Sequence, residues 1–352
     1  MANTILERLQ EKYPEAPGIN DARNIAEAIA CITNIGGRGA NAIADYIDAI
    51  GLSTVLYTDG LLIINEKIED RETNIAEHGE VVKEYEPWCT MQPYEFDNVN
   101  DIPWYVDRNS VLSVKFGSIV KPLSLDIWFH DCASCASIDT TNLDTSQCTS
   151  MDNTFNDCSA LTSVDVSGFD TSNVTSMSHI FYNCSAITSV DVSGFDTSKV
   201  KNFNSMFAGC TALTDLDVSG FDTSNVTDMA FMFQACQAIT SFDASGFDTS
   251  KVTTLKGMFT GCIALQVIDL SIFDTARVTD MSGMFYSDSN LETVYASDKF
   301  VTDAVTKGMG MFLSCTSLVG GNGTTYDANH VDAEYARIDT AETPGYFTAA
   351  SA

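Results

Sequence analysis

The sequence predicts an α/β repeat solenoid with a parallel sheet on one face. The first observation is a cysteine that returns every 26 residues, at Cys132, Cys158, Cys184, Cys210, Cys236 and Cys262. Asp288 takes the next place, and Cys315 follows after one extra residue. The second observation is that apolar residues keep the same places in every copy. A fixed period over this much chain is typical of stacked coils that contact only their neighbours. Such a fold offers a long repetitive face, which favours binding over catalysis.

Each copy divides into a strand, a turn and a return segment. In the copy that starts at Cys158, residues 161–166 alternate in polarity and predict the strand. The following SGFDTS predicts a turn in which Gly168 is free to adopt unusual backbone angles. Residues 174–181 have near-helical spacing and predict the return on the opposite side. One phenylalanine per copy is predicted to form a continuous interior column, consisting of Phe129, Phe155, Phe181, Phe207, Phe233, Phe259, Phe285 and Phe312.

The chain before the repeats predicts two further parts. Residues 1–52 predict short amphipathic helices, in which isoleucines recur at i, i+4 and i+7. These isoleucines are Ile25, Ile29, Ile32, Ile43, Ile47 and Ile50. Helices this short are marginal alone. They either pack on each other or on the next domain, or they form a docking and oligomerisation segment that makes the chain a homo-oligomer.

Residues 53–128 predict a small mixed α/β cap. It contains a hairpin around Asp59-Gly60 and a strand over 111–116. The cap covers the first coil, which would otherwise expose its core. The predicted domains are thus 1–52, 53–128, a solenoid over 129–314 and a C-terminal cap over 315–352.

Composition narrows the partners. The net charge of −30 disfavours nucleic acid and anionic membrane surfaces, because both attract basic proteins. The chain has no run of 18 apolar residues, and its opening residues lack the apolar core of a secretory signal. Because most of the cysteines follow the repeat, we interpret them as small buried side chains rather than disulfides.

Acidic residues form the candidate ligand face. The outward column consists of Asp139, Asp165, Asp191, Asp217, Asp243 and Asp269. Its members are expected about 5 Å apart, the spacing of neighbouring strands. They are either solvated or offset by cations or a basic partner. A second column is expected to cap the turns, with calcium as the less favoured alternative, and comprises Asp144, Asp170, Asp196, Asp222, Asp248 and Asp274.

Catalytic and metal signatures are absent from the sequence. The four histidines are far apart and show no metal-ligand spacing. Cys132 and Cys135 form a lone CxxC, in which Cys135 takes the leucine place of its repeat, so core packing is favoured over zinc or redox chemistry. No nucleophile elbow, phosphate loop or dinucleotide fingerprint occurs. We therefore predict a protein that is not an enzyme and has no cofactor or metal.

The repeat resembles a known family. The pattern F-x-x-C-x-x-L-x-x-V-x-V, followed by S-G-F-D-T-S and V-T-x-M, is similar to the BspA-type leucine-rich repeat, over about residues 53–350. The resemblance implies a leucine-rich-repeat solenoid used in adhesion and protein binding. The leader NIAEAI resembles the opening of structural proteins in phages and prophages of gut Firmicutes.

Together these resemblances imply a binding protein on a virion surface, of decoration, fibre or receptor-binding type. The N-terminal helices would dock to virion proteins or sister copies, and the repeats would attach to a host-surface protein or glycan. The alternative is a bacterial cell-surface or extracellular leucine-rich-repeat adhesin.

Overall fold

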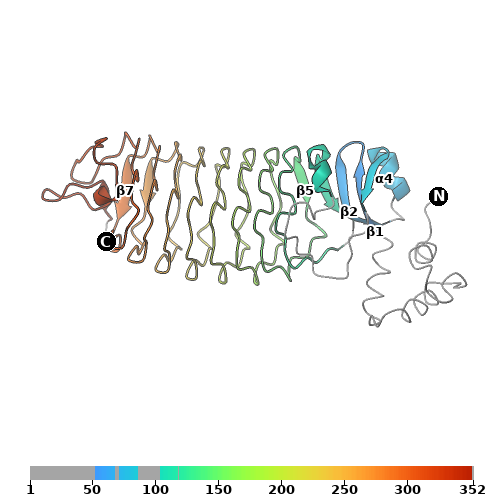
Figure 1. Cartoon of the computed structure of the whole chain (residues 1–352), viewed down its shortest axis with the longest axis horizontal. Coiled ribbons are helices and arrows are strands. Elements are labelled where there is room, and N and C mark those ends of the chain that lie inside the picture. The colour runs from blue at the N-terminus through green and yellow to red at the C-terminus, as the bar shows by residue number, and fades with distance from the viewer. Residues whose placement is uncertain (1–51, 68–70, 86–103, 118, 351–352) are drawn as a thin grey trace, which may run out of the picture.

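The repeats form coils that lie side by side along the long axis of an elongated molecule (Figure 1). The computed structural model describes residues 52–67, 71–85, 104–117 and 119–350. The N-terminal sheet lies at one end and the C-terminal coils at the other. The predicted helices of residues 1–52, with all six docking isoleucines, lie outside the described residues apart from Leu52.

A five-stranded sheet with the order β3-β1-β2-β4-β5 covers the first coil. Strands β1 (Leu52–Tyr57) and β2 (Leu61–Lys67) pair antiparallel around residues 58–60, which confirms the predicted hairpin. The turn suits its residues, because Gly60 has a φ of 82° and the Leu61 N–H donates to Asp59 Oδ1 at 3.1 Å.

The sequence analysis missed α4 (Arg71–His78) and β3 (Val81–Tyr85). β3 is an edge strand beside β1, and its Val82 is exposed. Its sequence therefore lacks the alternation of buried and exposed residues that predicts a strand.

The sheet continues directly into the repeats. After the short helix η4 (Tyr105–Ser110), β4 (Ser113–Phe116) pairs parallel with β2 on one side and with β5 (Ser137–Asp139) on the other. Trp104 and Trp128 are buried beneath it and meet edge to face at 6.1 Å. The cap therefore shields the N-terminal end of the coil interior.

The predicted phenylalanine column is confirmed. Consecutive rings from Phe129 to Phe312 stack with centroids 5.4–5.9 Å apart and interplanar angles of 5–12°. All eight side chains are buried. Near-parallel stacking of identical residues is what a repeat of constant length imposes, since each coil reproduces the backbone of the one before.

The cysteine column also lies in the interior. The nine cysteines among the described residues are buried and free, as predicted. In six coils the thiol also donates to the carbonyl of the phenylalanine 29 or 30 residues earlier, at 2.8–3.2 Å; Cys184 to Phe155 is one example. The cysteines are therefore hydrogen-bonded links between coils as well as small core residues.

The return segment has near-helical spacing of its apolar residues, but its backbone is not helical. In each coil the backbone N–H of alternate residues donates to the next coil, for example from Phe155 to Ile180 O at 2.9 Å. In each coil two residues four places apart have left-handed φ, such as Asn153 (57°) and Asp157 (60°). A helix would instead close i→i−4 bonds with negative φ. Apolar spacing alone does not separate these two structures, because both bury residues three or four apart.

The parallel sheet is also shorter than predicted. Among the described coils, strands form only near the two ends, as β5 and as the sheet of β6 (Val267–Asp269), β7 (Thr293–Ala296) and β8 (Phe347–Ala349). The continuous ladder of parallel bridges runs instead through the return segments, from Ser124 to Lys307. On the other side, the side chain of an aspartate such as Asp165 binds the N–H of Ser167 at 3.0 Å and turns the chain after a few extended residues.

Gly168 does not supply that turn. Its φ is not left-handed, and a Cβ there would meet no atom within 4 Å. The bend comes from the aspartate side chains on either side.

The C-terminal end is closed by the segment after the last coil. It contains η5 (Ala333–Tyr335) and β8, and Phe347 meets Phe312 edge-on at 5.9 Å. This contact ends the phenylalanine column.

Candidate binding surface

The six aspartates of the predicted ligand face lie on the surface of successive coils. Each is exposed, and each directs Oδ1 to the N–H two residues later at 2.8–3.0 Å. In four of them the same oxygen also accepts a Ser or Thr hydroxyl at 2.6 Å. The column therefore shapes the turns, while the second oxygen of each carboxylate remains for solvent or a partner.

Five of these six carboxylates have a lowered pKa, because each accepts hydrogen bonds from the residue two places later. At Asp191 the hydrogen bonds from the hydroxyl and N–H of Ser193 lower the pKa, and this effect outweighs the repulsion from Asp165 and Asp217. Hydrogen bonds from Ser167 and Ser219 lower the pKa of Asp165 and Asp217 in the same way. The hydrogen bonds within each turn therefore compensate the repulsion between neighbouring carboxylates.

The second acidic column has the capping geometry expected from the sequence. The Oδ1 atoms of its six members accept the N–H two residues later at 2.9–3.1 Å. A buried threonine follows each aspartate, and in five coils its hydroxyl donates to the backbone carbonyl of the aspartate in the next coil, at 2.9–3.1 Å. Each Asp-Thr pair therefore fixes one turn and one contact between coils.

Hydroxyl groups accompany the outward column. Thr162, Thr188 and Thr214 are exposed one after another, three residues before the aspartate of their coil. The hydroxyl of Thr214 donates to Thr188 O at 3.3 Å, so the row is tied along the coils. Next to it lie exposed Ser163 and Ser189.

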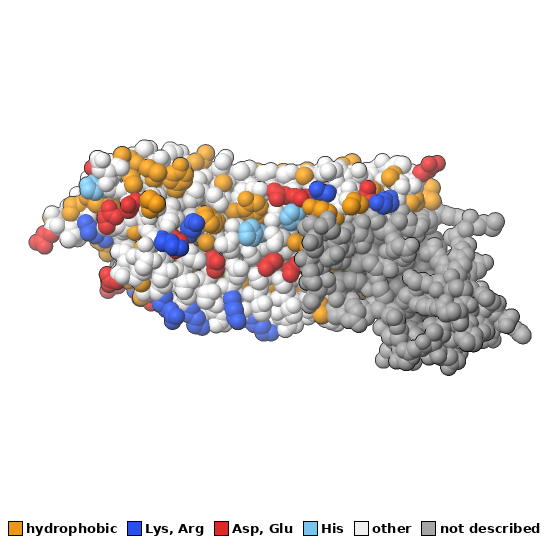
Figure 2. All heavy atoms as spheres, in the orientation of Figure 1, with side chains coloured by type: hydrophobic (Ala, Val, Ile, Leu, Met, Phe, Trp, Pro, Cys, Tyr) orange, Lys and Arg blue, Asp and Glu red, His pale blue; other side chains and the backbone are white. Residues whose placement is uncertain are grey.

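Large hydrophobic side chains are not exposed on the central coils. Among the described residues from 120 to 262 none is exposed, whereas Ile263, Val267, Tyr286, Met309 and others are exposed further on. In Figure 2 the largest orange patches lie toward the C-terminal end, and several basic side chains line the lower long edge of the coils. The central face is therefore polar, with a regular array of short hydroxyl and carboxylate groups.

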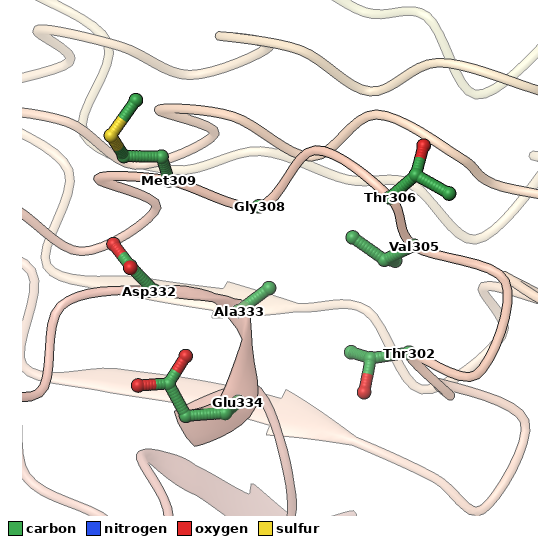
Figure 3. A pocket seen from close by; sticks show the side chains of 8 residues that line it. All are labelled: Thr302, Val305, Thr306, Gly308, Met309, Asp332, Ala333 and Glu334. Atoms are coloured by element: carbon green, nitrogen blue, oxygen red, sulfur yellow. The ribbon is translucent and has the colours of Figure 1, made fainter.

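A shallow pocket of about 310 Å³ lies beside the last coil (Figure 3). Its lining includes Thr302, Val305, Thr306, Met309, Asp332 and Glu334. Asp332 is already engaged, because Oδ1 accepts the Gly310 N–H at 2.7 Å. That N–H belongs to the last coil, whose N–H groups at Phe312 and Ser314 donate in the same way to Val331 O and the Tyr326 hydroxyl of the closing segment. Asp332 thus closes the stack.

The structure brings together three residues that the sequence analysis kept apart. His130, Asp131 and Asp157 place ligand atoms within 4.8 Å of one another. The signal was present in the sequence, because Asp157 follows Asp131 by one period of 26. Metal ligands predicted from a sequence are usually a few residues apart, so this group was not predicted. No helix among the described residues has the length and apolarity needed to cross a membrane.

Solved structures similar to this chain are described as leucine-rich repeat proteins. One from Bacteroides ovatus is 20% identical over 60% of this chain and 66% of its own length, just under two thirds, with a TM-score of 0.32. A leucine rich cell surface protein from Faecalibacterium prausnitzii is 17% identical over 59% of this chain and 72% of its own, with a TM-score of 0.28. A third, from Eubacterium ventriosum, is 15% identical over 80% and 97%, with a TM-score of 0.24.

No curated protein matches the chain. A family model does match, over residues 123–242 and 236–343, which together make up more than half of the sequence. These residues hold the coils from the first phenylalanine to the C-terminal closing segment. The chain belongs to the family described as Mycoplasma protein of unknown function, DUF285.

Proposed function

We propose that this protein is a non-enzymatic binding protein of the bacterial surface that contacts a surface protein or glycan through the polar face of its central coils. One observation carries the proposal. Each central coil exposes a hydroxyl and a carboxylate at the same place, and the carboxylate is oriented by its own turn.

The chemistry of this face suits a polymeric polar partner. A fixed row of acceptors and hydroxyl donors, repeated at the coil spacing of about 5 Å, offers many equivalent hydrogen-bonding sites. Each site is weak alone, but sites on one rigid support act together at high effective concentration. A glycan with repeating hydroxyl groups and an extended basic protein segment both fit.

The second part of the proposal concerns the location of the protein. The polar face fits a cell-surface or extracellular adhesin, and we favour that location. Virion display rests on the leader in residues 1–52, outside the described residues, and none of the similar proteins reported above is described as a virion protein. Antibody detection decides: the protein is expected in the surface fraction of the cells that make it. Recovery only in purified phage particles would contradict this location.

The binding face is tested with two matched triple variants. The first changes the outward column (Asp165→Asn, Asp191→Asn, Asp217→Asn), and the control changes the capping column (Asp170→Asn, Asp196→Asn, Asp222→Asn). Asparagine keeps the oxygen that accepts the turn N–H, so both variants stay folded and lose the same charge.

The assay measures binding of the full chain to intact bacterial cells and to an array of bacterial glycans. The first variant is expected to lose at least about tenfold in affinity, or about 1.4 kcal/mol, while the control binds like the wild type. Equal binding by all three proteins would contradict the assignment of this face.

The attachment role of residues 1–52 remains a separate proposal. If their isoleucine stripes drive association, the chain without residues 1–52 is expected to be a monomer in light scattering and the full chain an oligomer. The same number of chains per particle in both proteins would contradict it.

A further inference from the structure

The edge of the first two coils contains a group of side chains that the binding face does not use. Asp131 and Asp157 occupy equivalent places one period apart, and both have a φ of 60°. The same place holds Asn183, Gly209 and Ala235 in the following coils, so a pair of carboxylates occurs there only at the start of the stack. His130 lies directly before the first of them.

The imidazole provides an independent observation. His130 Nδ1 is buried, and no described residue gives it a hydrogen-bond partner. Its ion-pairing neighbour is Asp131 Oδ2, at 3.3 Å. The imidazole side chain as a whole is 24% exposed, which leaves a route from solvent to the nitrogen. A buried ring nitrogen without a hydrogen bond is costly, and each such group calls for an explanation such as an ion.

Neighbouring side chains hold the two carboxylates in place. The Tyr105 hydroxyl donates to Asp131 Oδ2 at 3.0 Å, and the Asn183 amide donates to Asp157 Oδ1 at 2.8 Å. The opposite oxygen of each carboxylate accepts no hydrogen bond from any residue that the structure describes. Each therefore retains a free lone pair while its orientation is fixed, which is how outer partners position metal ligands.

The charge nearby is only partly compensated. Arg108 Nε is 3.8 Å from Asp131 Oδ2, beyond hydrogen-bond distance. The guanidinium is instead held by Tyr105, since Nη1 donates to Tyr105 O at 2.8 Å and the group lies 4.0 Å above the Tyr105 ring. The two carboxylates thus outnumber the one guanidinium beside the imidazole.

We propose that His130, Asp131 and Asp157 bind a divalent transition metal, with Zn²⁺ as the best fit. One imidazole nitrogen and two carboxylate oxygens are ligands that zinc accepts, and three protein ligands leave a fourth position for water or a partner group. Tetrahedral zinc holds its ligand atoms about 3.4 Å apart, so the present separation of up to 4.8 Å closes through small side-chain rotations. The ion would link the first coil to the second, beside the N-terminal cap.

The test uses the full chain freed of metal by a chelator, and titrates it with Zn²⁺ in a calorimeter. The wild type is expected to bind one ion here. His130→Ala and Asp157→Asn are each expected to weaken binding at least about tenfold. Asp157→Asn keeps the oxygen that accepts the Asn183 amide, so it preserves the fold. His179→Ala, at a histidine outside this group of three ligands, serves as the control and is expected to bind like the wild type.

Two further measurements complete the test. Zinc is expected to raise the melting temperature of the wild type and the control, but not that of His130→Ala or Asp157→Asn. With Co²⁺ as a probe, the near-ultraviolet spectrum is expected to lack a thiolate charge-transfer band, because the proposed ligands include no cysteine and the neighbouring Cys132 and Cys158 are buried. Absence of zinc uptake by the wild type, or equal uptake by all four proteins, would overturn the proposal.

Discussion

Asp288 interrupts the cysteine column, and replacing it is expected to stabilise the protein. The side chain is fully buried between Cys262 and Cys315. Oδ1 accepts the Cys262 N–H at 2.8 Å, whereas Oδ2 is buried without a hydrogen-bond partner among the described residues. Burial raises the pKa of Asp288 from 3.8 to about 9, so the folded protein holds this carboxyl protonated at neutral pH.

The magnitude follows from proton linkage. Between pH 3.8 and about 9 the folded state binds one more proton than the unfolded state, so the stability contributed by this group falls as pH rises through that window. Below pH 3.8 the carboxyl is protonated in both states, and its contribution to stability is fully present. At pH 7 the loss reaches about 4 kcal/mol, at 1.36 kcal/mol per pH unit. Asp288→Asn removes the titration, and its amide supplies a donor toward Phe259 O, the carbonyl that a cysteine would contact here.

The assay is urea unfolding followed by circular dichroism at about pH 5, 7 and 8.5. Asp288→Asn is expected to be more stable than the wild type by about 2–4 kcal/mol at neutral pH, with a difference that grows as pH rises. Asp269→Asn makes the same substitution at an exposed position and is expected to stay within about 0.5 kcal/mol. Parallel pH profiles for the wild type and Asp288→Asn would refute the reasoning.

Three further predictions follow from the packing of the coils. Phe207→Ala leaves a cavity in the middle of the ring column and is expected to cost about 3–5 kcal/mol in urea unfolding; a loss below about 1 kcal/mol would contradict the stacking. Gly257→Ala places a Cβ against the Phe231 ring at a φ of 59°, so this variant is expected to lose more than about 1 kcal/mol of stability. The Cβ of Gly220→Ala meets open space, so its stability is expected to be unchanged or to increase by up to about 1 kcal/mol. Equal effects of the two substitutions would contradict the difference between the two backbone conformations. The nine described cysteines are expected to resist iodoacetamide until the chain unfolds, because burial protects them and raises their thiol pKa, in Cys210 to about 12; rapid labelling of the native protein at these positions would be the opposite result.

The interior could be predicted from the sequence because it depends on the period alone. Once the copies are stacked, phenylalanine must lie on phenylalanine and cysteine on cysteine, whatever backbone connects them. The hairpin at Asp59-Gly60 was predictable for a similar reason, since its turn residues specify it locally.

The backbone of the return segment could not be predicted, because hydrogen bonds between neighbouring coils determine its conformation. The left-handed places of the coils fall on Asn183, Gly209 and Gly261, types that tolerate such angles, but also on Ala235 and Phe231, which give no such signal. The candidate metal ligands were missed for a different reason: Asp157 lies one period after Asp131, and a spacing of 26 is not among the short ligand spacings that mark a metal site in a sequence.

The stacking of coils beneath a polar face is tested most directly by distances between spin labels. With Cys31 and Cys89 changed to serine, one label is placed at exposed Ser163 and the second at residue 267, 293 or 319, four, five and six coils away. The account predicts separations that grow by about 5 Å per coil, from about 20 to about 30 Å. Separations that do not increase with the number of intervening coils would contradict it.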